Sequence, residues 1–150
     1  MVGDGSYLMM NSEIVTSVML GLKLTIVVLD NRGFGCIDRL QRACGGAPFN
    51  NLFADCVQGA AGPPVIDFAA HAASLGARAE NVKTIPELEA ALGRARTSDR
   101  TYVIAIETDP HRTTEAGGVW WDVAIPEVSD RREVDEARRR YEASRARQQP

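Results

Sequence analysis

Leu24-Thr25-Ile26-Val27-Val28-Leu29 is a short run of apolar and β-branched residues without an alternation of apolar and polar positions. A strand that faces water on one side alternates, whereas a strand covered on both sides does not. The run therefore predicts a strand buried between two layers of helices, as in a parallel sheet. Residues 102–106 form a second run of this kind and predict a neighbouring buried strand.

Helical patterns lie before and between these strands. A first helix is expected between Asn11 or Ser12, its candidate N-caps, and Gly21, because apolar residues recur at helical spacing there. Asp67 is expected to cap a helix over residues 68–75, and Thr84 another. The apolar face of this last helix contains Leu88, Ala91, Leu92 and Ala95. Alternating helices and apolar strands predict an α/β fold, a three-layer parallel sheet with helices on both faces.

Two segments depart from this alternation. Residues 33–62 are rich in glycine, proline and asparagine, and we expect a long functional loop with a short helical piece near 37–43. Residues 132–147 predict a charged helix at the surface, with a thin apolar stripe of Val134, Ala137 and Tyr141. The pairs Asp135/Arg139 and Glu136/Arg140 have the i,i+4 spacing that ion pairs use on a helix.

Two polar motifs follow the expected strands. Gly3-Asp4-Gly5 comes directly after Met1-Val2, which we interpret as the end of a strand, and Asn31 follows the run 24–29. In an open parallel sheet, ligands bind outside the carboxyl ends of the strands. Asp4 offers a carboxylate oxygen, Asn31 an amide oxygen and Gly33 a backbone carbonyl. Together with ligand phosphate and water, such oxygens are typical ligands of Mg²⁺.

The glycines of both motifs favour binding of a phosphate. Gly5 and Ser6 open the turn into the first helix, where backbone N–H groups attract an anion. A glycine there removes the Cβ that would hinder close approach of a ligand. Gly33 and Gly35 give the second loop the same freedom. Each motif alone is an ordinary turn signal, but the order turn, helix, apolar strand and second oxygen ligand is far more specific.

The stretch from Gly3 to Gly35 resembles the signature of thiamine-diphosphate enzymes, G-D-G followed after some 25 residues by asparagine. The resemblance implies thiamine diphosphate and Mg²⁺ as cofactors, with Asp4, Asn31 and the Gly33 carbonyl as metal ligands. The residues implied to bind the cofactor are Gly3, Asp4, Gly5, Ser6, Asn31, Gly33, Phe34 and Gly35. Asp30 replaces the first of two asparagines found in many relatives, which leaves the ligand position intact. We accordingly assign residues 1–125 to the diphosphate- and Mg²⁺-binding part and 126–150 to a charged helix and tail.

Further segments narrow the resemblance to trihydroxycyclohexane-dione hydrolases of inositol catabolism, which are relatives of acetolactate synthase. These segments are residues 11–14, 30–35, 45–46 with 49–51, 67–72 and 113–122. The implied reaction is hydrolytic ring opening of 3D-(3,5/4)-trihydroxycyclohexane-1,2-dione to 5-deoxy-glucuronate, with the cofactor as electron sink. An acetolactate-synthase-like carboligase and a non-catalytic interaction protein with the same fold remain alternatives.

The resemblance also implies parts that this sequence does not contain. Family members have a pyrimidine-binding domain, which supplies an activating glutamate, usually across a dimer interface. Glu13 lies at the wrong end of the cofactor for that role, so no catalytic residue is assigned here. We expect the chain to be the C-terminal piece of a longer, homo-oligomeric enzyme, with Met1 an internal methionine or a mistaken start. Alone it is expected to be inactive, poorly stable, and dimeric or aggregated.

Composition excludes several other classes. Apolar residues make up 45% and charged residues 25% of the chain, so a packed core is expected. A net charge of -3 argues against nucleic-acid binding, and no run has the length of a membrane span or the pattern of a signal peptide. Cys36, Cys44 and Cys56 share no C-x-x-C spacing, which favours reduced thiols and a cytoplasmic protein.

Five further residues have open roles. His71 is expected to be a packed or surface histidine, whereas His111 lies in a loop that can approach a substrate. Cys36 can line the pocket, but no base partner is evident. Glu115 and Trp120 belong to a segment that either covers the site or packs on the sheet.

Overall fold

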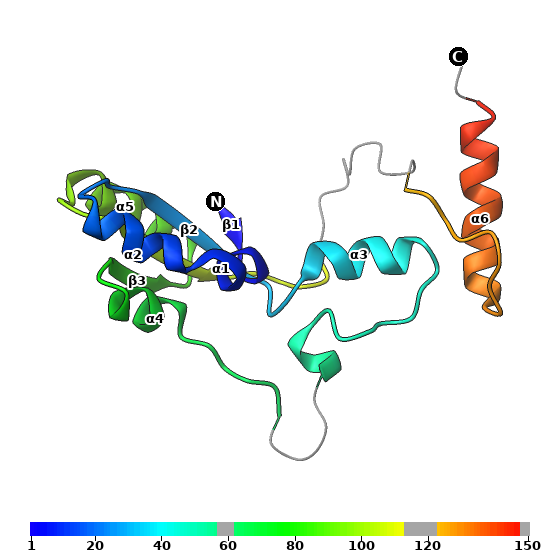
Figure 1. Ribbon diagram of the computed structural model, residues 1–150, viewed down its shortest axis with the longest axis horizontal. Helices are drawn as coiled ribbons and strands as arrows, with labels where there is room; N and C mark the ends of the chain where they lie inside the picture. Colours follow the sequence, from blue (N-terminus) through cyan, green and yellow to red (C-terminus); the bar gives the residue numbers. More distant parts are fainter. Residues whose placement is uncertain (57–61, 113–122, 148–150) are drawn as a thin grey trace.

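The computed structural model describes residues 1–56, 62–112 and 123–147. Figure 1 shows a parallel sheet with helices around it, and two further helices, α3 and α6, beyond one end of the sheet. In chain order the elements are β1 (Val2–Gly3), α1 (Asp4–Met10), α2 (Ser12–Met19), β2 (Thr25–Asp30), α3 (Gly35–Ala43), the 3₁₀ turn η1 (Phe53–Cys56), α4 (Phe68–Ser74), β3 (Arg78–Val82), α5 (Ile85–Thr97), β4 (Tyr102–Glu107) and α6 (Arg132–Arg145).

The four strands are all parallel and lie in the order β1-β2-β4-β3. The two apolar runs of the sequence, β2 and β4, are the central strands, and Thr25 to Asp30 pair in register with Tyr102 to Glu107. Their carboxyl ends therefore lie side by side. The predicted parallel α/β sheet is confirmed.

Each central strand contributes side chains to two separate cores, which explains its lack of alternation. Val103 and Ala105 pack with residues of α1, α2 and α4 on one face, including Tyr7. Ile104 and Ile106 pack on the other face with α5, whose Leu88, Ala91, Leu92 and Ala95 form the contact as predicted. Helices thus cover both faces of the sheet, and the three-layer prediction is confirmed.

The caps of α4 and α5 also agree with the sequence patterns. The Asp67 carboxylate accepts a hydrogen bond from the Ala70 N–H at 2.9 Å, and the Thr84 hydroxyl accepts one from the Glu87 N–H at 3.3 Å. After α4, Gly76 adopts φ +93°, a conformation that favours glycine.

The helix expected from Asn11 or Ser12 is confirmed as α2, which begins at Ser12. The predicted side-chain cap was wrong, because the Asn11 amide donates to the Leu8 carbonyl instead. Two elements were not predicted, and the first is helix α1, which begins at Asp4. Strand β3 was missed, because its residues Arg78–Val82 include charged and polar side chains. It lies at the edge of the sheet, where β4 is its single neighbour among the described strands, so an apolar run is not required.

Helix α6 lies against the end of α3 and not on the sheet (Figure 1). Val134 and Ala137 are buried with Ile125, as the apolar stripe predicted, and Tyr141 packs beside them. The predicted ion pairs were wrong: within α6 the structure pairs Arg132 with Glu136 and Arg138 with Glu142. A Cβ on Gly45 would overlap the backbone of Glu133, so the glycine allows this close approach.

The boundary after residue 125 stays a prediction. Glu115, Trp120 and Trp121 lie outside the described residues. Within residues 1–56, 62–112 and 123–147, no helix is long and apolar enough to cross a bilayer.

Candidate cofactor-binding site

The carboxylate of Asp4 is the centre of the site. Asp4 is the first residue of α1, directly after β1, and its side chain is fully buried. Its Oδ2 accepts a hydrogen bond from the Gly33 N–H at 2.6 Å, and its Oδ1 accepts a longer one from the Asn31 N–H at 3.4 Å. Because β1 and β2 are parallel neighbours, the two motifs that follow them lie together at the carboxyl ends of the strands. The sequence motifs, 27 residues apart, therefore meet in space.

The amide of Asn31 faces the same point. One terminal atom of this amide lies 3.0 Å from Asp4 Oδ1 and 2.9 Å from the Gly33 carbonyl oxygen. With nitrogen in this position the amide donates to both oxygens. With oxygen there, three oxygens converge and need a cation between them. The three groups predicted as metal ligands are therefore in contact with one another.

Burial raises the pKa of the Asp4 carboxyl above its usual value of 3.8. The hydrogen bond from Gly33 opposes this rise, and the nearby negative charge of Asp30 adds to it. Burial therefore makes the ionised Asp4 costly unless a positive charge binds beside it.

Three glycines leave the space that this arrangement needs. A Cβ on Gly35 would lie 2.8–2.9 Å from the side-chain atoms of Asn31, so its absence makes room for the amide. A Cβ on Gly5 would lie 2.7 Å from the Phe34 ring. Gly33 has φ +143° and passes so close to Leu52 that a Cβ there would lie 2.8 Å from the Leu52 Cα.

The loop after β2 is held by a segment that the sequence analysis did not assign to the site. The Phe34 N–H donates to the Asn51 carbonyl at 2.7 Å, and the Phe53 N–H donates to the Arg32 carbonyl at 2.9 Å. Gly33 and Leu52 form an antiparallel bridge. Residues 51–53 thus fix the backbone that presents Asn31 and Gly33. No motif marks this contact, because it depends on the path of the intervening loop.

Four other residues singled out in the sequence, Gly3, Ser6, Phe34 and Cys36, do not take part in the contacts around Asp4. Gly3 is the N-cap of α1, has an ordinary negative φ and has open space around its Cα. Ser6 is exposed in the first turn of α1. Phe34 is half-buried and packs on Gly5. Whether Gly3, Ser6 and Phe34 contact a cofactor stays a prediction, and so does a role for the exposed Cys36.

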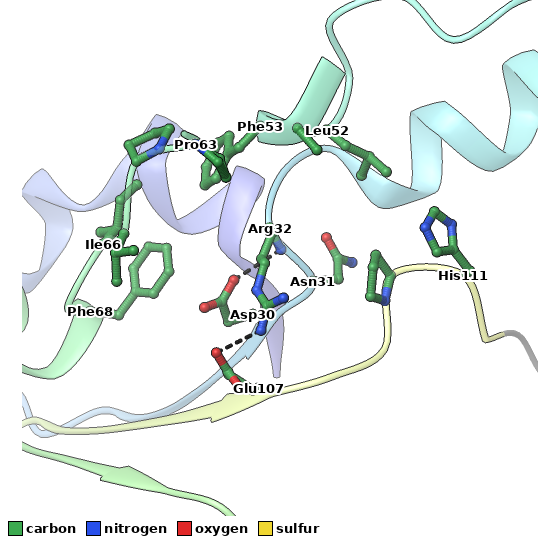
Figure 2. Close-up of a pocket in the computed structure, with 14 residues that line it drawn as sticks. Asp30, Asn31, Arg32, Leu52, Phe53, Pro63, Ile66, Phe68, Glu107 and His111 are labelled. Carbon is green, nitrogen blue, oxygen red and sulfur yellow. Dashed lines mark hydrogen bonds and ion pairs between the residues drawn. The ribbon is translucent and has the colours of Figure 1, made fainter. Parts of the chain in front are cut away.

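The two histidines lie in different places. His71 accepts or donates a hydrogen bond at 2.9 Å with the Tyr7 hydroxyl, which connects α4 to α1 as part of the packed layer. His111 is exposed, and lines a cavity near Asn31 (Figure 2). A role for His111 in substrate contact stays a prediction.

The cavity beside Asn31 measures about 480 Å³ and opens at the carboxyl ends of β2 and β4. Its polar residues are Asp30, Asn31, Arg32, Glu107 and His111. Its apolar wall comes from η1 with the residue before it, and from the segment that leads into α4; it includes Leu52, Phe53, Ile66 and Phe68. Figure 2 shows the Arg32 guanidinium paired with Glu107 in this cavity.

Asp4, Asn31 and Gly33 come together at the carboxyl ends of parallel strands, which is where open α/β sheets bind ligands. Residues 1–106 match the model of the thiamine pyrophosphate enzyme C-terminal domain, which binds thiamine pyrophosphate, and the chain belongs to this family. Thiamine pyrophosphate and thiamine diphosphate are the same cofactor.

Individual relatives are similar over most of this chain. The 3D-(3,5/4)-trihydroxycyclohexane-1,2-dione hydrolase of Geobacillus thermodenitrificans is 39% identical over 93% of this chain and 22% of that protein's length. The protein of the same name from Bacillus subtilis is 34% identical over 95% of this chain and 21% of its own length. The chain therefore spans about a fifth of the length of these curated relatives.

A solved structure shows the same fold. The thiamine diphosphate-dependent 4-hydroxybenzoylformate decarboxylase of Rhodococcus jostii RHA1 superposes with a TM-score of 0.61 at 21% identity. The match covers 72% of this chain and 19% of that one.

Proposed function

We propose that this chain is the diphosphate- and Mg²⁺-binding portion of a thiamine-diphosphate hydrolase that opens the ring of 3D-(3,5/4)-trihydroxycyclohexane-1,2-dione to 5-deoxy-glucuronate. The observation that carries the proposal is the similarity to proteins of this name, which extends at 33–39% identity over 91–97% of the chain. The similarity extends past the cofactor motif into the C-terminal segment, where a shared cofactor imposes no common sequence.

The converging oxygens of Asp4, Asn31 and Gly33 fit a bound Mg²⁺. With the Asn31 amide oxygen facing Asp4 and Gly33, the three residues would supply carboxylate, amide and carbonyl oxygens, which are ligands that Mg²⁺ prefers. The buried charge of Asp4 gains a positive neighbour in this arrangement. We assign these three residues as metal ligands, with the Asn31 amide oxygen turned toward Asp4.

The remaining residues of the anchor would orient the diphosphate. Gly5 and Ser6 lie in the first turn of α1, whose N-cap residue Gly3 has no side chain to cap it, and their N–H groups would face the diphosphate. Thiamine diphosphate supplies the electron sink for breaking the C–C bond between the two carbonyl carbons of the dione. The groups of this chain bind and orient the cofactor, and none of them is assigned a proton-transfer step.

A direct assay tests the proposal. The whole polypeptide encoded by the gene, supplied with thiamine diphosphate and Mg²⁺, is incubated with the dione, and acid formation is followed by pH-stat and mass spectrometry. We expect 5-deoxy-glucuronate, and its loss on removal of Mg²⁺ with EDTA. Consumption of pyruvate with acetolactate formation, without turnover of the dione, would instead assign a carboligase.

The pyrimidine-binding domain is the expected partner of this portion, in the same chain or in another, within a homo-oligomer. This chain spans about a fifth of the relatives' length, which supports this part of the proposal. The mass of the polypeptide and of its native assembly, measured from cells, tests it. A native mass of 16.3 kDa with full activity would contradict it.

A further inference from the structure

The cavity next to Asn31 combines a charged floor with an apolar wall. Its volume of about 480 Å³ lies in the usual range of small-molecule sites, roughly 300–1,000 Å³. Two carboxylates, of Asp30 and Glu107, and one guanidinium, of Arg32, belong to its polar side. Asn31 lines the cavity and also contacts Asp4, so the cavity adjoins the metal-ligand cluster.

Arg32 occupies an unusual position for an arginine. Its backbone has φ +64°, held by a hydrogen bond from its N–H to Asp30 Oδ1 at 2.9 Å. Glycine adopts this conformation without strain, whereas a long side chain rarely does. The backbone therefore does not require an arginine here, which indicates that the side chain has a use of its own.

That side chain extends over the cavity to the end of β4. Arg32 Nη2 lies 2.7 Å from Glu107 Oε1, and both side chains are more than half exposed. Among the described residues, no other N–H of this guanidinium has a protein acceptor. An arginine has five N–H donors in total, so the pair can donate and accept further hydrogen bonds at the same time.

We propose that this cavity binds a neutral cyclic polyol that carries carbonyl groups, with Arg32 and Glu107 as specificity-determining residues. The guanidinium donates to the carbonyl oxygens, and the Glu107 carboxylate accepts hydrogen bonds from hydroxyl groups. Phe53 and Ile66 cover the C–H face of the ring. The inference rests on the proposed function and assigns residues to its substrate.

The same charges disfavour a 2-oxo acid. A pyruvate-like substrate brings its own carboxylate, which Asp30 and Glu107 repel, while Arg32 is already neutralised by its partner. The charges of this pair therefore favour the hydrolase hypothesis over the carboligase hypothesis. The metal ligands cannot make this distinction, because both reactions use the same cofactor.

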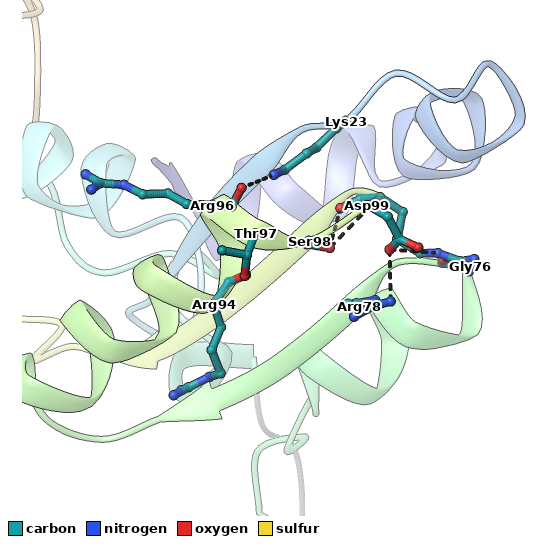
Figure 3. Close-up of polar contacts among 9 residues, drawn as sticks. Lys23, Gly76, Arg78, Arg94, Arg96, Thr97, Ser98 and Asp99 are labelled. Atoms are coloured by element: carbon teal, nitrogen blue, oxygen red, sulfur yellow. Dashed lines mark hydrogen bonds and ion pairs between the residues drawn. The ribbon is translucent and has the colours of Figure 1, made fainter.

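The chain offers a matched control at the opposite edge of the sheet. Arg78, at the start of β3, pairs with Asp99 at 2.9 Å (Figure 3), and its exposure resembles that of the Arg32–Glu107 pair: 56% and 67% against 54% and 69%. A substitution that acts only by removing an exposed ion pair should therefore have the same effect at either pair. Only the first pair borders the cavity.

The experiment compares Glu107→Gln, Arg32→Met and Arg32→Lys with Arg78→Met and Asp99→Asn, all in the whole polypeptide with thiamine diphosphate and Mg²⁺. The readouts are KM and kcat for the dione, and binding of myo-inositol, a ring polyol without carbonyls, by saturation-transfer NMR. We expect Glu107→Gln to raise KM and to weaken myo-inositol binding roughly tenfold, as for loss of a hydrogen bond to a charged group. Arg32→Lys keeps the charge and should restore part of what Arg32→Met loses.

The outcomes separate the two proposals. If the control variants behave as the parent, both cavity variants raise KM for the dione and Glu107→Gln weakens myo-inositol binding, the inference holds. An unchanged KM in either cavity variant, or unchanged myo-inositol binding in Glu107→Gln, would overturn it and leave the proposed function intact. If the parent does not turn over the dione, the proposed function fails, and polyol binding that still depends on Glu107 supports the inference alone. Equal effects of the control pair would also overturn it.

Discussion

At the scale of single residues, the site depends on a buried charge and on absent side chains. Asp4 is fully buried, and burial raises its pKa although backbone N–H groups donate to it, so its ionised form is only partly compensated in the protein alone. Gly35 provides the room in which the Asn31 amide lies beside Asp4. Substitutions of Asp4 and Gly35 should therefore change cofactor binding while leaving the stability of the fold nearly unchanged.

Asp4→Asn should abolish Mg²⁺-dependent stabilisation with little effect on the protein without ligands. The substitution removes a metal ligand, but it also removes a charge that burial disfavours. We expect the free energy of unfolding without ligand to stay within ~1 kcal/mol of the parent. The stabilisation by cofactor, about 2.7 kcal/mol at 100 times the Kd, should disappear. Chemical unfolding of the whole polypeptide with and without Mg²⁺ and thiamine diphosphate measures both. Retained stabilisation in the variant would remove Asp4 from the ligand set.

Gly35→Ala should weaken cofactor binding while the fold persists. The added Cβ would lie 2.8–2.9 Å from the Asn31 side chain and displace its amide. We expect the Kd for thiamine diphosphate with Mg²⁺, measured by calorimetry, to rise roughly tenfold or more. Gly93→Ala in α5, where a Cβ meets no atom within 4 Å, is the matched control.

At the scale of elements, strands and helices are joined by polar contacts as well as by the two cores. Arg94 of α5 donates two hydrogen bonds to Glu80 of β3, at 2.9 and 2.6 Å, and the Tyr102 hydroxyl of β4 donates a third at 2.5 Å. These contacts connect the edge strand, which has few apolar side chains, to its neighbours. The hydrogen bonds from Arg94 lower the pKa of Glu80 below its usual 4.5, against the opposing effect of burial.

Glu80→Gln should reduce stability only where Glu80 is ionised. Because the folded-state pKa of Glu80 is lowered, its contribution is present above pH 4.5 and is lost as the pH falls below that value. At pH 7 we expect a loss of about 0.5–1 kcal/mol, the range of partly exposed ion pairs. Urea unfolding at pH 7 and pH 3.5 tests this, with Glu89→Gln on α5 as control. A difference that persists undiminished at pH 3.5 would assign the loss to packing.

At the scale of the whole molecule, several large apolar side chains face water. They lie on α1, α2 and the turn that follows, and comprise Met9, Met10, Met19, Leu20 and Leu22, each between 62% and 80% exposed. Strand β1, which leads directly into α1, lies at the sheet edge and pairs only with β2 among the described strands. Exposed apolar surface next to an open sheet edge favours association.

The 150-residue chain, produced by itself, should therefore self-associate. Light scattering after gel filtration should show species larger than 16.3 kDa, and the double substitution Met19→Lys and Leu22→Lys should shift the distribution toward monomer. Val128→Lys, at a side chain 90% exposed outside this region, should change nothing. A monomeric parent chain at high concentration would contradict the prediction.

Local patterns were sufficient for much of the fold and for the centre of the site. The apolar runs that form β2 and β4 lack alternation because their side chains enter two cores. Asp4, Asn31 and Gly33 meet because the carboxyl ends of neighbouring parallel strands lie side by side. Strand β3 and the separate helix α1 were not predicted, since an edge strand needs no apolar run and a glycine N-cap carries no side-chain signal.

The sequence by itself determined the α/β class, the parallel sheet and the family, because apolar periodicity and motif spacing are local properties of the chain. Only the tertiary structure decided what surrounds the motif. It showed that Asn51 to Phe53 hold the loop, that Gly35 makes room for Asn31, and that Arg32 reaches Glu107 across a cavity. These contacts join residues between 4 and 75 positions apart. Their geometry depends on loop paths and close packing, which no local pattern encodes.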